Sequence, residues 1–137
     1  MSHLLDTNVL SETKKPRPHP AVARWLAETP LSQLHISVMT VGEIARGITQ
    51  LTHRGDVPQA TFLRAWLDKT VEKFGHRVVP VTTDVAQEWA AQHPARPVPV
   101  ADALIAATAK VHGLTLVTRN VKDFEATGVR LLNPFTG

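Results

Sequence analysis

The sequence contains no cysteine, and this absence excludes several kinds of chemistry. A chain without cysteine has no disulfide framework, no thiolate nucleophile and no cysteine-ligated zinc. The 7 histidines form no His-x-x-x-His pair, so each is interpreted as a surface or core side chain rather than a metal ligand. Carboxylates, hydroxyls and isolated histidines are therefore the groups left to carry a reaction.

Aromatic residues and long apolar runs are scarce as well. Aromatic content is 5% with no tyrosine, so stacking platforms for bases are not expected, and a nucleic acid would be held through its phosphates. The net charge of +3 favours a polyanionic partner only mildly. No apolar run approaches the roughly 20 residues of a membrane span, and no charged-then-apolar leader is present. We therefore expect a cytoplasmic protein without a membrane partner.

Length and apolar content favour one compact domain, because 137 residues with 43% hydrophobic content can bury a substantial core. We expect this domain to cover residues 1–137. Short apolar runs alternate with longer segments of helical periodicity. The predicted strands cover residues 3–5, 34–37, 78–81, 115–118 and 130–132. The predicted helices cover residues 19–28, 38–51, 59–74, 84–92 and 101–112, and the predicted loops cover residues 14–20, 53–58 and 95–100.

This alternation predicts an α/β fold with a mostly parallel sheet of about five strands and helices on both faces. In such a sheet, strand carboxyl ends and helix amino ends share the edge at which ligands bind. Asp6 follows the first strand, and Glu43 lies early in the helix after the second. Asp102 lies in the first turn of the helix before the fourth strand, and Asp123 lies a few residues after that strand. The sequence therefore predicts four acids at one edge of the sheet.

Four neighbouring carboxylates repel one another. At about 5 Å and an effective dielectric constant near 20, each like-charged pair costs on the order of 3 kcal/mol. Divalent cations would neutralise this repulsion, and oxygen donors suit Mg²⁺ or Mn²⁺ rather than zinc. The acidic edge therefore predicts a magnesium or manganese site.

Each acid also has a simpler explanation when it is taken alone. Asp6 is suited to cap the following helix, and Asp102 favours a helix amino terminus. The Thr40-x-x-Glu43 spacing fits a capping box, and the Asn120-x-x-Asp123 spacing resembles one. Capping does not require that acids occupy all four of these positions together.

Four stretches carry a family resemblance: LLDTNVLSE (4–12), ISVMTVGEIARGI (36–48), VADALIAATAKVHGLTLVTRNVKDF (100–124) and GVRLLNPF (128–135). With them the chain resembles the PIN-domain ribonucleases, and within these the VapC-type toxins of bacterial toxin–antitoxin pairs. The stretches span nearly the whole chain in the family's order. Residues 52–99 carry little of the signature.

The resemblance implies a single PIN-like domain and a metal-dependent endoribonuclease with Mg²⁺, or Mn²⁺, in an acidic pocket. The catalytic and metal-binding positions are matched by Asp6, Glu43, Asp102 and Asp123. The polar residues that support them are matched by Thr7, Asn8, Thr118 and Asn120. The resemblance further implies a homodimer and a small antitoxin that covers the pocket and contacts DNA, so that DNA is only an indirect partner.

Basic and aromatic residues add candidates for contacts. Seven residues on or near segments that lead to the acidic edge are candidates for guiding RNA phosphates, although an ordinary solvated surface explains them equally well. Trp25 and Trp66 are candidates for subunit surfaces or for core packing. The seven basic candidates are Lys14, Lys15, Arg17, Arg46, Arg96, Arg119 and Lys122.

Other functions remain as alternatives. A phosphotransferase of the haloacid-dehalogenase kind also has an aspartate after its first strand, but it needs a second acid two residues later, where this chain has Asn8. A phospho-acceptor signalling receiver needs an acceptor aspartate after a middle strand. The aspartate that follows the third predicted strand is Asp84, and it is better interpreted as the start of a helix. A non-catalytic PIN-like scaffold is the third alternative, although such a scaffold is expected to have lost acids that this chain retains.

Overall fold

The computed structural model describes residues 1–93 and 97–136 and contains a five-stranded sheet with the order β3-β2-β1-β4-β5. All four pairings between neighbouring strands are parallel. The strands are β1 (His3–Leu5), β2 (Leu34–Ser37), β3 (Val78–Val79), β4 (Thr115–Val117) and β5 (Leu131–Leu132). The predicted parallel sheet is confirmed, and all strand carboxyl ends lie along one edge.

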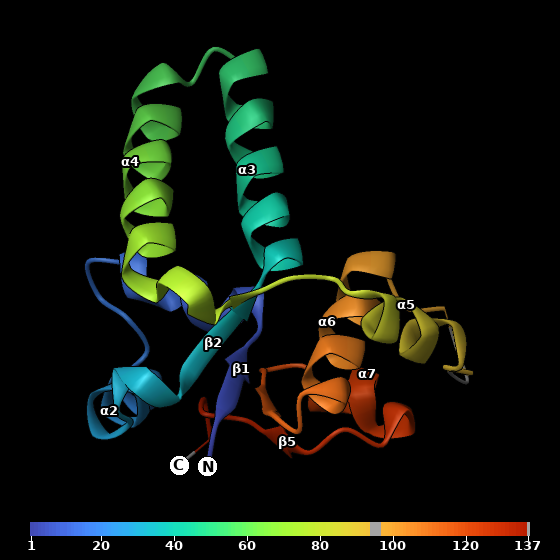
Figure 1. The fold of residues 1–137 in the computed structure, drawn as a ribbon. Helices are drawn as coiled ribbons and strands as arrows, with labels where there is room; N and C mark the ends of the chain where they lie inside the picture. Colours follow the sequence, from blue (N-terminus) through green and yellow to red (C-terminus); the bar gives the residue numbers. More distant parts are fainter. Residues whose placement is uncertain (94–96, 137) are drawn as a thin grey trace.

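Seven α-helices lie within the described residues, with short 3-10 turns between some of them. Figure 1 shows α3 and α4 side by side as a hairpin that rises from the carboxyl edge, whereas α5, α6 and α7 lie together on the other side of the sheet. None of the helices in residues 1–93 and 97–136 is long and apolar enough to cross a membrane. The helices are α1 (Thr7–Leu10), α2 (Pro20–Glu28), α3 (Val38–His53), α4 (Val57–Phe74), α5 (Thr83–Ala90), α6 (Val100–Val111) and α7 (Val121–Phe124).

Helices cover both faces of the sheet, as predicted. Successive side chains of β1 point to opposite faces, so Leu5 packs into a core with α2, α3 and α4, and Leu4 packs into a second core with α6. Trp25 and Trp66 are partly buried against the first core, which supports the core-packing interpretation of both side chains. The central strand is thus fixed from both sides just before Asp6.

The three predicted loops are wrong in extent, and for two of them the reason is that proline fits the first turn of a helix. In the 53–58 loop, α3 continues to His53 and α4 begins at Val57, with Pro58 in its first turn and Asp56 as its N-cap. In the 14–20 loop, a 3-10 turn extends to residue 14 and α2 begins at Pro20. The 95–100 loop lies partly outside the described residues, and residue 100 already belongs to α6.

Strand and helix ends also differ from the predictions. Strand β3 ends at Val79 rather than at residue 81, since Pro80 has no N–H to donate to a ladder. Strands β4 and β5 are each one residue shorter than predicted. Helices α2, α5 and α6 differ from their predicted ends by one or two residues. These differences leave each predicted acid at the same edge.

Candidate active site

Asp6 is the most buried of the four predicted acids, with 4% of its surface exposed. It follows β1 directly, and its backbone N–H donates to the carbonyl of Val117 at 2.9 Å. Oδ1 accepts a 2.8 Å hydrogen bond from the N–H of Thr7, so Asp6 does cap α1. Oδ2 accepts hydrogen bonds from Thr118 Oγ1 at 2.7 Å and from Asn8 Nδ2 at 3.4 Å. Capping accounts for the first contact only, because Thr118 reaches Asp6 from the end of another strand.

Within the described residues, Glu43 is held by the hydroxyl of Thr7 rather than by a basic side chain. Thr7 Oγ1 donates to Glu43 Oε1 at 2.6 Å and also lies 3.2 Å from Oγ1 of the fully buried Thr40. Thr7 has one hydroxyl proton, and the charged carboxylate is the stronger acceptor, so Thr40 is left to donate to Thr7. A chain of hydroxyls therefore runs from the interior of α3 to Glu43.

The capping-box explanation of Glu43 is wrong. Ser37 is the N-cap of α3 and accepts a hydrogen bond from the N–H of Met39, which places Thr40 inside the helix. Asn120 is the N-cap of α7, but its side chain makes no capping hydrogen bond there. Neither spacing therefore works as a capping box.

The four supporting residues form one network between the ends of β1 and β4. The N–H of Asn120 donates to Thr118 Oγ1 at 3.0 Å, and the N–H of Arg119 donates to Asn8 Oδ1 at 3.4 Å. The amide of Asn8 thus donates to Asp6 and accepts from the neighbouring loop. An amide in this position has no acid proton to transfer, which disfavours the haloacid-dehalogenase alternative.

Electrostatic coupling joins all four acids. The pKa of Asp102 is raised to about 6, first by burial and then by the negative charges of Asp6, Glu43 and Asp123. Burial also raises the pKa of Asp6, while the hydrogen bonds from Thr118 and Thr7 oppose that rise. The fold has therefore brought Asp6, Glu43 and Asp123 close enough to Asp102 to disfavour the ionisation of Asp102.

The donor chemistry of these acids fits a hard divalent cation. Within residues 1–93 and 97–136, no three His, Asp or Glu side chains converge closely enough to form a metal-binding group by themselves. Among the described residues, the acids therefore do not form a preassembled set of three metal ligands. No described lysine or arginine forms an ion pair with Asp6, Glu43 or Asp102, so no ion pair within residues 1–93 and 97–136 neutralises the charge of these three acids. Carboxylate oxygens without nitrogen or sulfur donors are ligands that Mg²⁺ and Mn²⁺ prefer.

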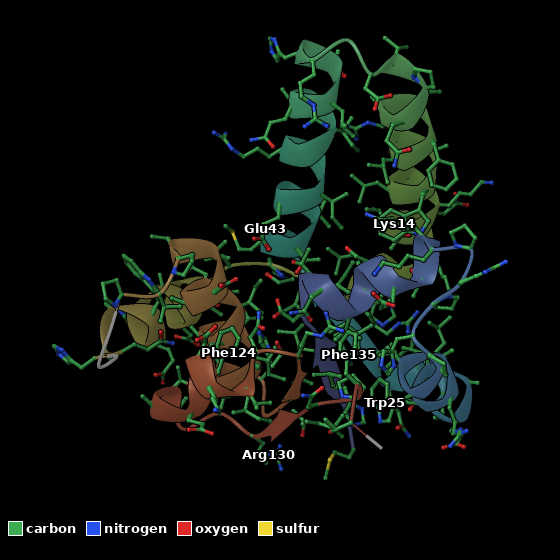
Figure 2. All side chains as sticks on the ribbon, turned by 180° about the vertical axis from the view of Figure 1, so that it is seen from behind. Lys14, Trp25, Glu43, Phe124, Arg130 and Phe135 are labelled. Carbon is green, nitrogen blue, oxygen red and sulfur yellow. The ribbon has the colours of Figure 1, made fainter. Side chains whose placement is uncertain are left out.

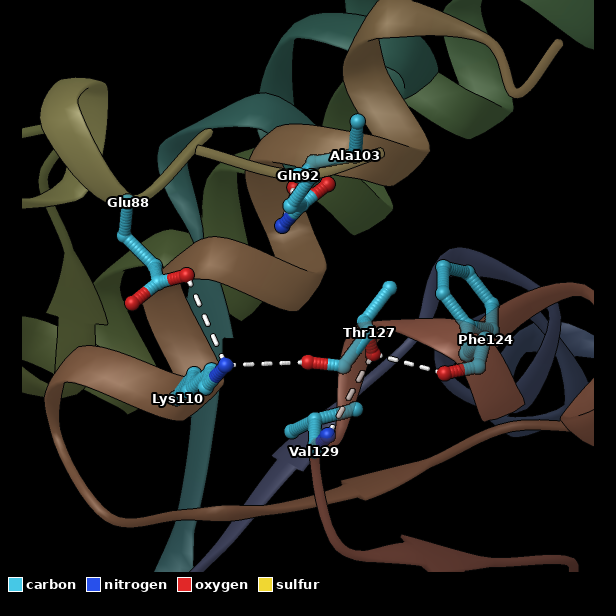
Figure 3. Close-up of polar contacts among 7 residues, drawn as sticks. All are labelled: Glu88, Gln92, Ala103, Lys110, Phe124, Thr127 and Val129. Atoms are coloured by element: carbon cyan, nitrogen blue, oxygen red, sulfur yellow. Dashed lines mark hydrogen bonds and ion pairs between the residues drawn. The ribbon is translucent and has the colours of Figure 1, made fainter. Parts of the chain in front are cut away.

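Helix α6, which carries Asp102, is anchored at its far end by Lys110. Figure 3 shows Lys110 Nζ between Glu88 of α5, at 3.6 Å, and the carbonyl oxygen of Thr127, at 3.1 Å. Thr127 lies just after α7, which carries Asp123. Lys110 therefore links the helix of one acid to the segment that follows the other.

The seven predicted RNA-binding residues differ in how close they lie to the acidic edge. Arg119 and Lys122 flank the acidic edge on the loop after β4 and on α7, and Arg46 is exposed on α3 one turn beyond Glu43. Arg17 is exposed in the segment before α2, and Arg96 lies outside the described residues. Proximity to the acids is therefore clearest for Arg119 and Lys122.

Lys14 and Lys15 are engaged with the protein itself. Lys14 Nζ lies over the ring of Trp66, 5.5 Å from its centroid, and Figure 2 shows Lys14 beside α4 whereas Glu43 lies at the base of α3. Lys15 pairs with Glu12. These contacts make both lysines parts of the fold rather than free cations at the acidic edge.

Two further side chains beside the site were not predicted. Glu12 is 4% exposed, accepts hydrogen bonds from Lys15 Nζ and from the N–H of His19, and its pKa is lowered mainly by the Lys15 contact. Thr40 belongs to the chain of hydroxyls described above. Both occur within the stretches that carry the family resemblance, and Thr40 was also part of the spacing that resembled a capping box.

Comparisons with known proteins agree with this arrangement. The PIN domain family profile matches residues 3–129. The toxin FitB of Neisseria gonorrhoeae is 34% identical to the chain, with 96% of this chain and 97% of FitB covered. The VapC ribonuclease Y4jK of Sinorhizobium fredii is 31% identical, with 96% of each chain covered.

Solved structures show the same architecture. The structure of FitAB bound to an IR36 DNA fragment matches with a TM-score of 0.86 and 31% identity, covering 98% of this chain and 96% of the other. A toxin–antitoxin complex from Klebsiella pneumoniae matches with a TM-score of 0.67 and 28% identity, covering 97% and 98%. Since the family profile covers most of the chain and the relatives align over nearly their full lengths, this chain belongs to the PIN-domain family and, within it, to the group that includes VapC-type ribonucleases and FitB.

Proposed function

We propose that this protein is an Mg²⁺- or Mn²⁺-dependent endoribonuclease that hydrolyses RNA phosphodiester bonds in the cytoplasm as the toxin of a type II toxin–antitoxin pair. The observation that carries the proposal is the position of Asp6, Glu43 and Asp123 close to Asp102, whose pKa is raised to about 6 first by burial and then by these three negative charges. The similarity to a VapC ribonuclease and to the toxin FitB supports RNA as the substrate. The whole chain, residues 1–137, would act as one nuclease domain.

Asp6, Asp102 and Asp123 would hold the cation through their carboxylates. A divalent cation, when bound, supplies Lewis acidity toward the phosphoryl oxygens and lowers the pKa of water. Glu43, oriented by the hydroxyl of Thr7, would either join these ligands or accept a proton from the attacking water.

The supporting residues fix the carboxylates before substrate arrives. The contacts from Thr118, Asn8 and the Thr7 backbone prevent the Asp6 carboxylate from rotating, so both of its oxygens keep their directions. Asn120 holds Thr118 in turn. Such fixed orientation lowers the reorganisation needed when the cation and RNA bind.

Cleavage of total RNA by purified, partner-free protein tests the activity. We expect new RNA ends with Mg²⁺ or Mn²⁺ and none with excess EDTA, and mapping these ends would identify the sequence that is cut. Asp102→Asn is the matched inactive variant. Cleavage that continues in EDTA would contradict the mechanism, and absence of cleavage with every RNA and either metal would favour the binding scaffold.

The toxin assignment makes separate predictions about partners and growth. The similarity to solved FitAB and toxin–antitoxin complexes supports a small antitoxin that covers the acidic edge and carries the DNA contact. We also expect a homodimer, which light scattering at micromolar concentration measures directly. Expression without the antitoxin should arrest growth, whereas Asp102→Asn expressed at the same level should not.

A further inference from the structure

A polar hollow of about 380 Å³ lies beside the acidic edge. It includes Asp123, one of the four acids, so it adjoins the proposed cleavage centre. Apart from Val121, its lining consists of charged and amide side chains. The lining residues are Arg119, Asn120, Val121, Lys122, Asp123 and Asn133.

The guanidinium of Arg119 is held in place by an aromatic ring. Its central carbon lies 4.0 Å from the centroid of the Phe135 ring, and that ring in turn makes an edge contact with His19 at 5.2 Å between centroids. Stacking occupies the face of a guanidinium and leaves its N–H edges available to acceptors. Arg119 is exposed, and it forms no ion pair with any carboxylate among the described residues.

The backbone around Arg119 is fixed by the same segment that supplies the ring. The carbonyl of Arg119 accepts a 3.4 Å hydrogen bond from Asn133 Nδ2, and Asn133 Oδ1 accepts one from the N–H of Phe135 at 2.9 Å. The N–H of Arg119 donates to Asn8, which contacts Asp6. One set of contacts thus positions both the guanidinium and an acid of the cleavage centre.

The hollow carries positive charge, which the four acids of the cleavage centre do not supply. Arg119 and Lys122 place two cations at its wall, next to carboxylates that repel an approaching polyanion. A chain without tyrosine and with 5% aromatic residues has few surfaces on which to stack bases, so contact with the RNA backbone is the expected mode.

We propose that this hollow binds an RNA backbone phosphate beside the cleavage centre, with Arg119 as its main ligand and Phe135 as the positioning residue for that guanidinium. The proposal rests on the RNA substrate proposed above. It concerns binding alone, so it is testable without cleavage.

RNA-binding measurements test the proposal. The probes are fluorescein-labelled oligouridylate and oligoadenylate of 12 nucleotides, and their binding is measured by fluorescence anisotropy. Each titration is done in EDTA and again with Ca²⁺, at salt concentrations from about 20 to about 150 mM. Loss of one phosphate contact lowers the slope of log Kd against log salt by about 0.7 on single strands. We expect Arg119→Gln to show this decrease and to weaken both probes equally, since a phosphate contact is indifferent to sequence. Arg130→Gln is the matched control, because Arg130 is an exposed arginine before β5, at the opposite edge of the sheet (Figure 2).

Phe135 is tested through affinity and salt dependence together. Phe135→Leu keeps the Arg119 charge, so the salt slope should stay while Kd rises several-fold, and Phe135→Tyr should restore the parent Kd. A general loss of folding would instead lower the melting temperature, which is measured on the same samples.

The outcomes separate this proposal from the proposed function. If the parent cleaves RNA but Arg119→Gln binds the probes as well as Arg130→Gln does, the hollow is not a phosphate site and the nuclease assignment stands. A loss confined to one probe would also overturn the phosphate assignment. A parent that neither binds the probes nor cleaves RNA would overturn the function and the hollow together.

Discussion

Asp6 experiences two opposing effects on its ionisation. Its contacts with the N–H of Thr7 and the hydroxyl of Thr118 stabilise the charged form, whereas burial destabilises it more strongly, and the net effect is a raised pKa. Capping of α1 uses only the contact with Thr7, whereas the buried carboxylate of Asp6 also accepts a hydrogen bond from Thr118, just after β4. The burial of Asp6 is therefore tolerated for a reason other than the four-residue helix α1.

The Asp6→Asn substitution distinguishes the role of Asp6 as a helix cap from its role as one of four clustered negative charges. Asparagine caps a helix about as well as aspartate but removes one of the four negative charges. We expect the metal-free variant to melt higher than the parent at pH 7.5, by on the order of 1 kcal/mol or about 4 °C, because a buried and repelled charge is gone. Saturating Mg²⁺ should reverse this order, because it stabilises the parent more through mass action.

The control for this comparison is Asp68→Asn, since Asp68 is exposed on α4 and lies outside the cluster. Thermal melts with and without Mg²⁺ measure the stability, and the RNA assay measures the activity, which should fall by orders of magnitude for Asp6→Asn alone. An active variant with an unchanged melting curve would show that Asp6 is only a cap.

Thr40 is predicted to act on Glu43 through Thr7. Thr40→Val keeps the size of the buried side chain but removes the hydroxyl that donates to Thr7. A hydrogen bond in a chain that ends on a charged group contributes about 1.5 kcal/mol, so we expect kcat to fall by about tenfold with little change in KM. Thr40→Ser keeps the hydroxyl and should restore kcat.

A purely structural role for Thr40 would produce a different result. In that case Thr40→Val would lower the melting temperature and leave kcat unchanged, and Thr40→Ser would be the less stable of the two because it leaves a small cavity. Steady-state kinetics on the RNA fragment defined by end mapping, together with melting curves, distinguishes the two results.

At this scale, the sequence predicted the acids better than their partners. Asp6, Glu43, Asp102 and Asp123 could be placed because each follows a strand or begins a helix at one sheet edge. Thr40 lies three residues before Glu43, and that spacing was consistent with a capping box. Only the position of Ser37 as the actual N-cap shows that the hydroxyl of Thr40 points elsewhere.

Among the elements, the helices and strands were predictable in type and order, but their ends were not. Periodicity identifies the apolar face of a helix, whereas its first residue depends on which cap and which proline the tertiary structure accepts. Asp56 and Pro58 illustrate this, since both are residue types that are common in loops, but here Asp56 is the N-cap of α4 and Pro58 lies in its first turn. The 3-10 turns were also missed because they are too short to produce a periodic pattern.

Helix α6 carries the next prediction, because it holds Asp102 while Lys110 ties its last turn to two other segments. Lys110→Met keeps the alkyl stem but removes the contacts to Glu88 and to the Thr127 carbonyl. A surface ion pair and one hydrogen bond together contribute about 1 kcal/mol, so urea denaturation should show a loss of that size. Since α6 and the segment after α7 are then less firmly joined, the Mg²⁺ concentration that gives half-maximal cleavage should also rise.

The matched control for α6 is Lys69→Met, on the exposed surface of α4. An exposed substitution away from the site is expected to change stability by less than about 0.5 kcal/mol. If both methionine variants behave alike in urea and in the Mg²⁺ titration, Lys110 does not anchor the helix of Asp102.

At the scale of the whole molecule, the net charge of +3 conceals a separation of charge. Carboxylates gather at the carboxyl edge of the sheet, and Arg119 and Lys122 stand beside them. A uniformly basic surface would bind RNA without directing it, whereas cations next to the acidic edge would direct a polyanion to the proposed metal site. Folding therefore creates a specific arrangement that the composition of the chain does not reveal.

The stability of the whole metal-free protein should depend on pH, and Asp102 and His3 contribute to this dependence with opposite signs. The folded pKa of Asp102 is raised to about 6 from 3.8, so its stabilising contribution is present below pH 4 and is lost as the pH rises through about 6. The pKa of His3, which is 8% exposed, is lowered from 6.5, first by burial and then by the amino terminus and His35. Its contribution is therefore present above pH 6.5 and is lost as the pH falls.

Two substitutions separate these contributions in melts from pH 4.5 to 8. Asp102→Asn removes the carboxyl group whose protonation stabilises the protein at low pH. The melting temperature of this variant should therefore exceed that of the parent at pH 7.5 and approach it near pH 4.5. His3→Gln removes the imidazole whose neutral form stabilises the protein at high pH. The melting temperature of this variant should therefore fall less than that of the parent on acidification. Mg²⁺ should stabilise the parent more at pH 7.5 than at pH 5, because protons and the cation compete for the Asp102 carboxylate. If the difference between Asp102→Asn and the parent is the same at every pH, then Asp102 ionises as an ordinary aspartate and is not coupled to Asp6, Glu43 and Asp123.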